Sequence, residues 1–340
     1  MHHGQRPRRL ATWVDRDLPE LQPRVTTHTI TAADAGQRLD RWLRKALPDV
    51  PLAAIFRHVR SGRIRVDGKK ADGALRLAAG MQIELRLPAA DLAALTEERP
   101  RRAAAAATAA WPPELAPKIV LADDDILVVD KPAGLAAQPG TGAEQVNLVA
   151  WLDHQRLGQR STTFASAPAH RLDRGTSGLL AIGLSPRGLR GLTAAFRDDR
   201  VDKGYVAVVH GVPASASGSI TAPLRENANP RPERPRVVVA ADGKPARTDW
   251  TVLGTFGDTT LVRLVLFTGR LHQIRAHLAH FGHPIVGDRR YGSRVTMPGR
   301  FLLHAARLAF LHPVTGAELD LRAPLPAHFG AAARMPFDWS

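Results

Sequence analysis

One acidic side chain between two arginines is the part of this sequence best suited to chemistry. Residues 170–180 read HRLDRGTSGLL, so Asp173 lies between Arg171 and Arg174. The Gly-Thr-Ser-Gly run that follows predicts a tight loop leading into a buried strand near Leu179. Nearby cations favour the ionised form of a carboxylate, which a nucleophile or a base requires. An aspartate that only bonds to its own turn is the alternative, and these residues alone leave both interpretations open.

The same segment holds the residue types of a Ser-His-Asp hydrolase, because His170 and Ser177 flank Asp173. Such hydrolases usually present the serine in a Gly-x-Ser-x-Gly elbow. The sequence has no such elbow. We therefore favour a single reactive carboxylate over a Ser-His-Asp hydrolase.

A second segment, residues 268–284, reads TGRLHQIRAHLAHFGHP and predicts a helix that Gly282 and Pro284 end. Arg270 and Arg275 then lie near the start of this helix, beside a strand that ends close by. The apolar residues that recur at helical spacing and predict its buried face are Leu271, Ile274, Leu278 and Phe281.

Three histidines near the end of this helix, His277, His280 and His283, suggest a metal site. The helix stops between them, carboxylates are scarce nearby, and no His-Glu-x-x-His motif occurs. We expect these histidines to pack or to contact phosphate, and we predict no metal site. A metal hydrolase that uses them is kept as a separate hypothesis, which chelation would test.

Positive charge is concentrated in residues 29–90. Apolar spacing predicts two short helices, over residues 39–47 and 55–59, and alternation predicts strands over 64–66 and 81–87. Like charges at helical spacing repel one another, and few acidic residues offset them, so we predict RNA as the partner, with a solvated face as the alternative. The basic residues of this region are Arg38, Arg41, Arg44, Lys45, Arg57, Arg60, Arg63, Arg65, Lys69 and Lys70.

Composition divides the chain into four parts: a basic flexible leader (1–28), the basic region (29–90), an Ala- and Pro-rich linker (91–117) and a large domain (118–340). Many strands and few helices predict an α+β fold with a mixed, mainly antiparallel sheet, rather than a doubly wound one. Helices are predicted over 186–197 and 272–281. The strands predicted in the large domain cover residues 119–121, 126–129, 179–184, 205–209, 246–253 and 261–267.

The overall charge also points to a polyanionic partner. The 340 residues include 47 Lys and Arg against 32 Asp and Glu, a formal net charge of +15, which attracts nucleic acid. The absence of cysteine excludes disulfides, thiolate metal sites and cysteine nucleophiles. No run of 18 apolar residues and no signal-peptide core occur, so we expect a cytoplasmic protein.

In combination, these motifs resemble the RluA-type pseudouridine synthases. The matching strings are His-Arg-Leu-Asp with Thr-Ser-Gly-Leu-Leu (170–180), Tyr205, which stands 32 residues after Asp173, and Gly-Arg-x-His-Gln-Ile-Arg-x-His (269–277). The resemblance covers most of residues 118–324. It implies an enzyme that isomerises uridine in RNA to pseudouridine, with no cofactor, because the reaction needs no redox change and no external reactant.

The basic region adds to this resemblance. Its order of helix, helix and hairpin, with Gly-Arg-Ile-Arg-Val-Asp-Gly at residues 62–68, resembles the S-four-type RNA-binding domain that ribosomal RNA members of the family usually carry. Lys-Pro-Ala at residues 244–246 is similar to the branch that acts on large-subunit (23S) ribosomal RNA. The resemblance therefore implies ribosomal RNA, or an assembling large subunit, as the partner of a monomeric enzyme.

The family resemblance also implies roles for individual residues. Asp173 is the essential carboxylate, acting at C1′ or at the 2′ position of the ribose, and Arg275 is its buried ion-pair partner. Tyr205 stacks on the uracil and helps to remove the C5 proton, with a core aromatic as the alternative. Arg171 fills the gap left by the extruded nucleotide, or contacts phosphate.

Further residues are expected to contact RNA or the base. Leu302, or its neighbour Leu303, packs on the second face of the base. The remaining expected contacts in the large domain are His170, Arg174, Lys203, Arg270, His272, Gln273 and Ile274. Those in the basic region are Arg38, Arg41, Arg44, Arg60, Arg63 and Arg65.

The sequence departs from the family pattern at two places outside the catalytic strings. Residues 181–184 read Ala-Ile-Gly-Leu where Val-Ala-Lys is usual, and the customary Asn-Lys-Pro with a later histidine is here Asp130-Lys131-Pro132 with Gln138. These differences leave the RNA site open. The alternative functions are a pseudouridine synthase that acts on transfer RNA and a non-catalytic RNA-binding or ribosome-assembly factor.

Overall fold

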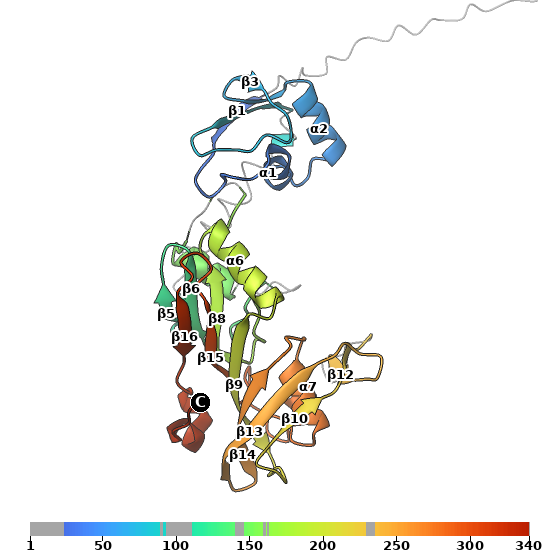
Figure 1. Cartoon of the computed structure of the whole chain (residues 1–340), viewed down its shortest axis with the longest axis vertical. Helices are drawn as coiled ribbons and strands as arrows, with labels where there is room; N and C mark the ends of the chain where they lie inside the picture. Colours follow the sequence, from blue (N-terminus) through green and yellow to red (C-terminus); the bar gives the residue numbers. More distant parts are fainter. Residues whose placement is uncertain are drawn as a thin grey trace, which may run out of the picture. The chain divides into compact units, whose positions relative to one another are not determined.

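The computed structural model shows two compact units, Met1–Glu98 and Arg99–Ser340. Figure 1 shows the elements of each unit. No helix in the described part of the chain is long and apolar enough to cross a membrane. The structure describes residues 24–88, 91–92, 111–139, 146–158, 161, 163–228 and 235–339.

The first unit packs two helices against a sheet with strand order β1-β4-β2-β3. Trp42 and Leu43, on the helix predicted from apolar spacing, are fully buried in its core. The strands are antiparallel. The elements are β1 (Arg24–Thr29), α1 (Leu39–Ala46), α2 (Leu52–Arg60), β2 (Ile64–Val66), β3 (Lys69–Lys70) and β4 (Gln82–Leu87).

Strand β1 corrects one boundary of the sequence analysis. Residues 24–28 were assigned to an unstructured leader, but Arg24–Thr29 pairs with Gln82–Leu87 of β4 along its whole length. Its sequence, RVTTHT, has few apolar residues because only one face of this edge strand meets the core. The alternation signal for a strand is therefore weak. Most of the predicted leader and of the predicted linker lies outside the described residues.

The second unit is built on a mixed sheet of ten strands among the described residues. Eight strands follow the order β10-β13-β14-β9-β15-β8-β6-β5; β16 pairs with β15, and β7 pairs with β8. Among these ten strands, only the pairing of β8 with β15 is parallel. The strands are β5 (Lys118–Ala122), β6 (Ile126–Lys131), β7 (Ala167–Pro168), β8 (Ser177–Gly183), β9 (Val201–His210), β10 (Ser217–Thr221), β13 (Arg247–Phe256), β14 (Thr259–Leu266), β15 (Leu303–Leu311) and β16 (Glu318–Arg322).

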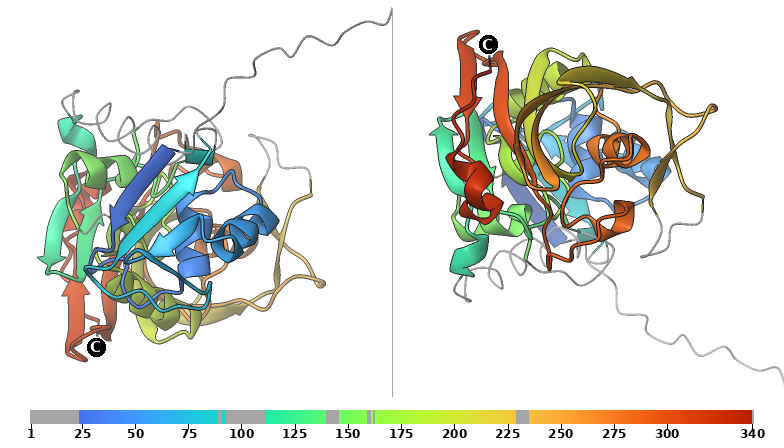
Figure 2. Two further views of the ribbon diagram at one scale, coloured as in Figure 1. Left: turned by 90° about the horizontal axis from the view of Figure 1, so that it is seen from above. Right: turned by 90° about the horizontal axis from the view of Figure 1, so that it is seen from below.

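Helices and a small hairpin complete this unit. The helix α6 begins at the predicted Pro186, capped by the side chain of Ser185, which accepts the N–H of Gly188. The sheet curves around α7 (Figure 2), which is why nearly every residue of that helix is buried. The other elements are α5 (Leu148–His154), α6 (Pro186–Arg197), α7 (Gln273–His280), the hairpin β11 (Leu224–Glu226) and β12 (Val237–Val239), and the 3-10 turns η1 (Pro113–Leu115), η2 (Arg289–Tyr291) and η3 (Ala327–Arg334).

The predicted α+β fold with a mainly antiparallel sheet is confirmed. One detail of the predicted helix faces is wrong. Phe281 was placed on the buried face of α7, but its side chain is exposed, because the helix ends at His280 and Phe281 already begins the turn through Gly282. There it stacks in a tilted contact with Trp250.

Candidate active site

Asp173 lies in the loop that leads into β8, and this loop is held tightly on two sides. The N–H of Thr176 donates to the backbone oxygen of Asp173 at 3.1 Å, which closes the turn. A Cβ on Gly175 would lie 2.5 Å from the ring of Phe301, and one on Gly178, whose φ is +111°, would overlap the backbone of Ala305. The two glycines of the motif are therefore required for the loop to sit against β15.

The ion pair that the sequence analysis expects at Asp173 is present. Nη1 of Arg275, on α7, donates to Oδ2 of Asp173 at 2.8 Å. Nε and Nη2 of the same guanidinium donate to the two carboxylate oxygens of Asp288, at 2.6 and 2.9 Å. Burial alone would lower the pKa of Arg275, but the bonds and charges of Asp288 and Asp173 raise it above its ordinary value.

The guanidinium of Arg275 is also held between two aromatic rings. Its Cζ lies 4.7 Å from the ring centre of Tyr291 and 4.6 Å from that of Phe301. Cations are attracted to aromatic faces, and Arg275 is largely removed from water. One cation is thus fixed in position by two carboxylates and two rings, with a single N–H directed at Asp173.

His272 is the second basic group beside Asp173. Its Nε2 lies 3.6 Å from Oδ1 of Asp173, while Nδ1 is 2.9 Å from the hydroxyl of Tyr291. Burial lowers the pKa of His272 to about 4, against the opposing charge of Asp173, so the imidazole is neutral at physiological pH. The two oxygens of Asp173 therefore face different partners, one cationic and one neutral.

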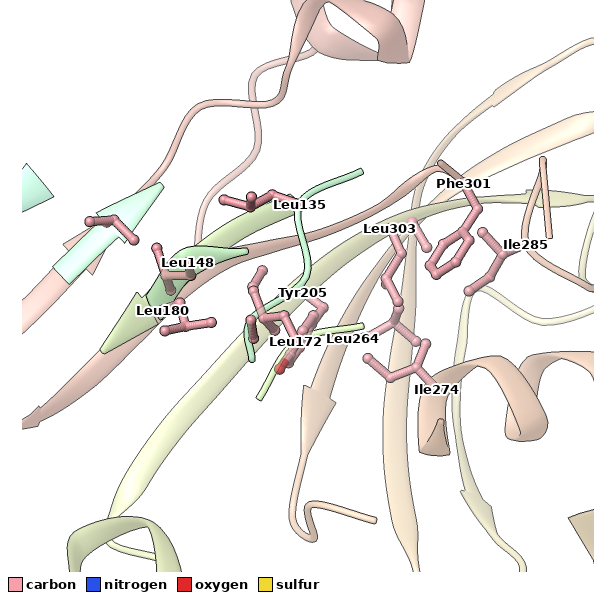
Figure 3. Packing of buried hydrophobic residues seen from close by; sticks show 14 of the residues in the cluster. Leu135, Leu148, Leu172, Leu180, Tyr205, Leu264, Ile274, Ile285, Phe301 and Leu303 are labelled. Carbon is pink, nitrogen blue, oxygen red and sulfur yellow. The ribbon is translucent and has the colours of Figure 1, made fainter. Parts of the chain in front are cut away.

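Tyr205, on β9, lines a cavity of about 80 Å³ next to Asp173, together with apolar side chains on one side and Arg171, Arg270 and Arg275 on the other. Figure 3 shows its ring among Leu172, Leu264, Ile274 and Leu303. Burial, together with the negative charge of Asp173, raises the pKa of Tyr205, so the phenol keeps its proton at neutral pH. The arrangement places a carboxylate, a phenol and aliphatic side chains around one small space.

A wider cavity of about 730 Å³ lies on the other side of Asp173 and is lined by arginines. Arg171 is exposed and makes no ion pair or hydrogen bond within the described part of the chain. Arg174 donates to the backbone oxygen of Gly134 at 2.9 Å, which ties the Asp173 loop to the loop after β6. The arginines of this cavity other than Arg275 are Arg171, Arg174, Arg236 and Arg290. Such a lining suits a phosphate backbone.

Some predicted contacts of the large domain lie at the small cavity beside Asp173. Ile274 is buried in its wall, and Arg270, at its rim, is exposed and donates to the backbone oxygen of Pro245. Gln273 also lines this cavity, but its amide is fully used: it bonds to Thr268, Thr248 and the backbone of Arg247 and Arg270. We therefore correct the prediction for Gln273, which shapes the loop and has no group left for RNA.

Leu302 is a second correction. Neighbouring residues of an extended chain point to opposite faces, and Leu302 packs with Val206 and Phe329 on the far side of the sheet. Leu303 is the residue that lines the cavity with Tyr205. The sequence motif could not decide between the two because the strand that begins at Leu303 was not predicted.

His170 and Lys203 lie away from the cavity and are the third correction. Nε2 of His170 accepts the N–H of Ala181 at 3.0 Å, and its ring stacks on Phe196 at 4.1 Å. Burial lowers the pKa of His170 to about 3, so the ring is a neutral acceptor. The ammonium group of Lys203 is largely buried and pairs with Asp199 at 3.5 Å.

Two of the three histidines of the hypothetical metal site bond to the protein itself, and the third, His280, is exposed. Both ring nitrogens of His277 bond at 2.9 Å, one to Thr248 and one to the backbone oxygen of Ala222. Nδ1 of His283 bonds to the backbone oxygen of His210. Within the residues that the structure describes, no group of three His, Asp or Glu is arranged to hold a metal ion.

The predicted RNA-contacting arginines of the first unit are mostly free. Arg41, Arg44, Arg60 and Arg63 are exposed and make no ion pair with any residue of the described part. Arg38 instead pairs with Asp40 at 2.6 Å. Arg65 donates to the backbone oxygens of Gly62 and Gly68 and so supports the hairpin.

Phe56 adds an aromatic surface to these charges. It is 37% exposed and, together with Arg60 and Lys70, lines a cavity of about 720 Å³ in the first unit. An exposed ring between cations is a feature on which an unpaired base can stack.

Sequence reasoning missed the residues that hold Arg275 and His272. Asp288, Tyr291 and Phe301 all follow α7, in a stretch without helical or strand periodicity. The available signal was a lone acidic residue, Asp288, followed directly by Arg289 and Arg290.

Comparisons with known proteins show the family to which the chain belongs. A family model described as RNA pseudouridylate synthase matches residues 125–280. The chain is 38% identical over 314 residues to the ribosomal large subunit pseudouridine synthase C of Escherichia coli K12, covering 89% of this chain and 94% of that protein. The protein of the same name from Vibrio vulnificus is 35% identical over 316 residues, covering 91% and 95%.

A solved structure gives the same result for the fold. Human RNA Pseudouridylate Synthase Domain Containing 1 superposes with a TM-score of 0.52 and 26% identity, covering 66% of this chain and 90% of the human one. The chain belongs to the RluA-type RNA pseudouridine synthases, enzymes that isomerise uridine in RNA to pseudouridine. Predicted family and enzyme class are both confirmed.

Proposed function

We propose that this enzyme forms pseudouridine in large-subunit ribosomal RNA and that Asp173 is its catalytic carboxylate. The proposal is carried by one observation: among the described residues, Asp173 is the only carboxylate that lines both the small cavity with Tyr205 and the arginine-lined cavity. The RNA class follows from the relatives that match nearly the whole chain, which are named for the large ribosomal subunit.

The reaction breaks the N1–C1′ bond of uridine, turns the base, joins C5 to C1′, and moves a proton from C5 to N1. Asp173 acts on the ribose, at C1′ or at the 2′ position, while Arg275 holds the carboxylate in place through its bond to Oδ2. A glycosidase would need a second carboxylate to deliver water. Among the described residues that line the small cavity, Asp173 is the only carboxylate, and Tyr205, Ile274 and Leu303 supply apolar surface on which the base can pack.

Tyr205 and Arg171 are proposed to handle the base. The phenol of Tyr205 borders the cavity close to Asp173, where its ring can stack on the uracil and its hydroxyl can assist loss of the C5 proton. Arg171 borders both cavities with a free guanidinium. It fills the space that the extruded nucleotide leaves in the RNA.

We propose that the first unit is an S-four-type RNA-binding domain over residues 29–90. Strand β1 (Arg24–Thr29) extends this domain on its N-terminal side. Free arginines and an exposed Phe56 support this assignment. We also propose that the enzyme acts as a monomer, because Arg275, His272 and Tyr205 already surround Asp173 within the second unit. Its substrate is free ribosomal RNA or an assembling large subunit.

The decisive test is Asp173→Asn, assayed on large-subunit ribosomal RNA that carries tritium at C5 of uridine. Loss of the C5 proton releases the label, so the wild-type enzyme is expected to release tritium. The variant is expected to bind the RNA normally and release none, because the amide cannot act as a nucleophile or a base. Asp258→Asn, in the exposed turn before β14, is the matched control and should retain full activity. Turnover by Asp173→Asn would remove the assignment.

A further inference from the structure

Tyr291 connects the site to the β11–β12 hairpin by two hydrogen bonds. The N–H of Val237, in β12, donates to the Tyr291 hydroxyl at 3.0 Å, in a buried position. A backbone N–H can only donate, so the hydroxyl accepts this bond and its own proton remains available. Among the described residues, the other partner of the hydroxyl is Nδ1 of His272, at 2.9 Å. The tyrosine therefore donates to the histidine.

This donation fixes the tautomer of His272. Because Nδ1 accepts from Tyr291, the ring proton must lie on Nε2. Nε2 is directed at Oδ1 of Asp173 at 3.6 Å, just beyond hydrogen-bond distance. The other oxygen, Oδ2, already accepts from Arg275 at 2.8 Å. Catalytic hydrogen bonds that are long in the free enzyme often shorten when substrate binds.

The backbone of His272 supports this placement. Its φ of 51° and ψ of 23° lie in the left-handed region, which residues with a Cβ rarely adopt. Such strain persists where the surroundings hold it, and it is typical of functional sites. Here it places the imidazole between Tyr291 and Asp173, immediately before α7 begins.

We infer that His272 is a positioning residue for Asp173, that Tyr291 sets its tautomer and orientation, and that Val237 links both to strand β12. The inference rests on the proposed role of Asp173. Arg236, next to Val237 in the chain, lines the arginine cavity. The relay runs from Val237 through Tyr291 and His272 to Asp173. Contact of Arg236 with RNA therefore acts on the strand in which this relay begins.

Three variants, His272→Gln, His272→Met and Tyr291→Phe, test the relay in single-turnover tritium release. His272→Gln keeps an N–H near the position of Nε2, whereas His272→Met has a similar size and no donor. Because partners of this kind typically contribute 10- to 100-fold, we expect His272→Met and Tyr291→Phe each to slow the step by about 10-fold or more, and His272→Gln by no more than about 3-fold. RNA affinity should stay unchanged in all three.

The double variant Tyr291→Phe/His272→Met should be no slower than His272→Met, since residues that act through one another are not additive. Thr260→Val removes a comparable buried bond, to Gly211, far from Asp173. This control should lower the melting temperature without changing the rate. Additive losses in the double variant, or equal losses in His272→Gln and His272→Met, would overturn the relay.

A second readout is independent of activity. In the full-length enzyme labelled with ¹⁵N-histidine, the His272 resonances, assigned by their absence in His272→Gln, should show the Nε2–H tautomer. Tyr291→Phe should shift them toward the other tautomer. An Nδ1–H or protonated imidazole in the wild type disproves the relay even if the enzyme is active. A wild type that releases no tritium but has the Nε2–H tautomer instead refutes the proposed function and leaves the geometry standing.

Discussion

Arg275 is held by four partners, and two of them, Asp173 and Phe301, border the arginine-lined cavity. Asp288 is 2% exposed and accepts two of the three N–H bonds that the guanidinium donates to Asp173 and Asp288, with Tyr291 and Phe301 on its faces. A buried cation with a single acidic partner could rotate with that partner. Because Asp288 holds the guanidinium of Arg275 in place, Arg275 in turn fixes the orientation of the Asp173 carboxylate.

Asp288→Asn is expected to lower both stability and activity. Breaking one side of a buried ion pair typically costs about 3 kcal/mol or more of unfolding free energy, and a mobile Arg275 should slow pseudouridine formation at least about 10-fold. Urea denaturation and tritium release measure the two effects. Asp249→Asn breaks an exposed pair of the same kind, with Arg247, and should cost less than about 1 kcal/mol. Equal losses in the two variants would contradict a special role for Asp288.

Individual residues of the site also show which contacts can be predicted from the sequence and which cannot. Asp173 and Arg275 belong to dense motifs, so their pairing could be expected before the structure was known. Asp288 and Tyr291 lie in an aperiodic loop, and their importance comes only from tertiary contacts that bring them back onto α7. Leu302 and Leu303 were indistinguishable until β15 was seen, because the face of a strand depends on its register.

At the scale of elements, helices α1 and α2 and hairpin β2–β3 present the free arginines of the first unit. We predict that replacing Arg41, Arg44, Arg60 and Arg63 together by Gln weakens RNA binding and flattens its salt dependence. Each lost phosphate contact should reduce the slope of log K against log[salt] by about 0.7 to 0.9. Filter binding from low to high salt measures the slope.

The matched control replaces the same four arginines by Lys. This variant keeps the charge, so its salt slope should equal that of the wild type, although stacking and bidentate contacts are lost. A slope that stays unchanged in the Gln variant would show that this surface does not contact the RNA backbone.

Strands β8, β9, β13 and β14 could be predicted because their apolar residues form continuous or alternating runs. Strand β15, with the sequence LHAARLAFL, was missed, since its alanines and spaced leucines equally fit a helix. The hairpin β11–β12 was missed because its two short strands are separated by a long connection. In each case the pairing partner, rather than the local sequence, decides the structure.

At the scale of the whole molecule, several histidines are buried in their neutral form, and they determine how the unfolding free energy depends on pH. Burial lowers the pKa of His170 to about 3 and of His272 and His304 to about 4, from 6.5 in the unfolded chain. At a pH between the folded and the unfolded pKa of each histidine, only the unfolded state binds a proton there. Their contribution to stability is therefore complete above pH 6.5 and is lost as the pH falls toward 4.

We predict that the unfolding free energy falls steeply from pH 6.5 to about 4.5. His170→Gln keeps an acceptor for Ala181 and removes one titrating group, so it should reduce the slope by about one proton, or about 1.4 kcal/mol per pH unit. Urea denaturation at a series of pH values measures this. Thr260→Val, which removes a buried hydrogen bond but no titrating group, should lower the unfolding free energy and leave the slope unchanged. An identical slope in His170→Gln and the wild type would refute the linkage.

Strand β15 lies between β8, which follows Asp173, and β9, which carries Tyr205. These two strands are not adjacent in the sheet, and they are joined only through a segment more than 90 residues further along the chain, Leu303–Leu311. A nascent polypeptide that ends at residue 300 has the motifs of Asp173, Tyr205 and Arg275 but lacks the strand that joins β8 to β9. Assembly of the catalytic site during translation must therefore wait for this strand.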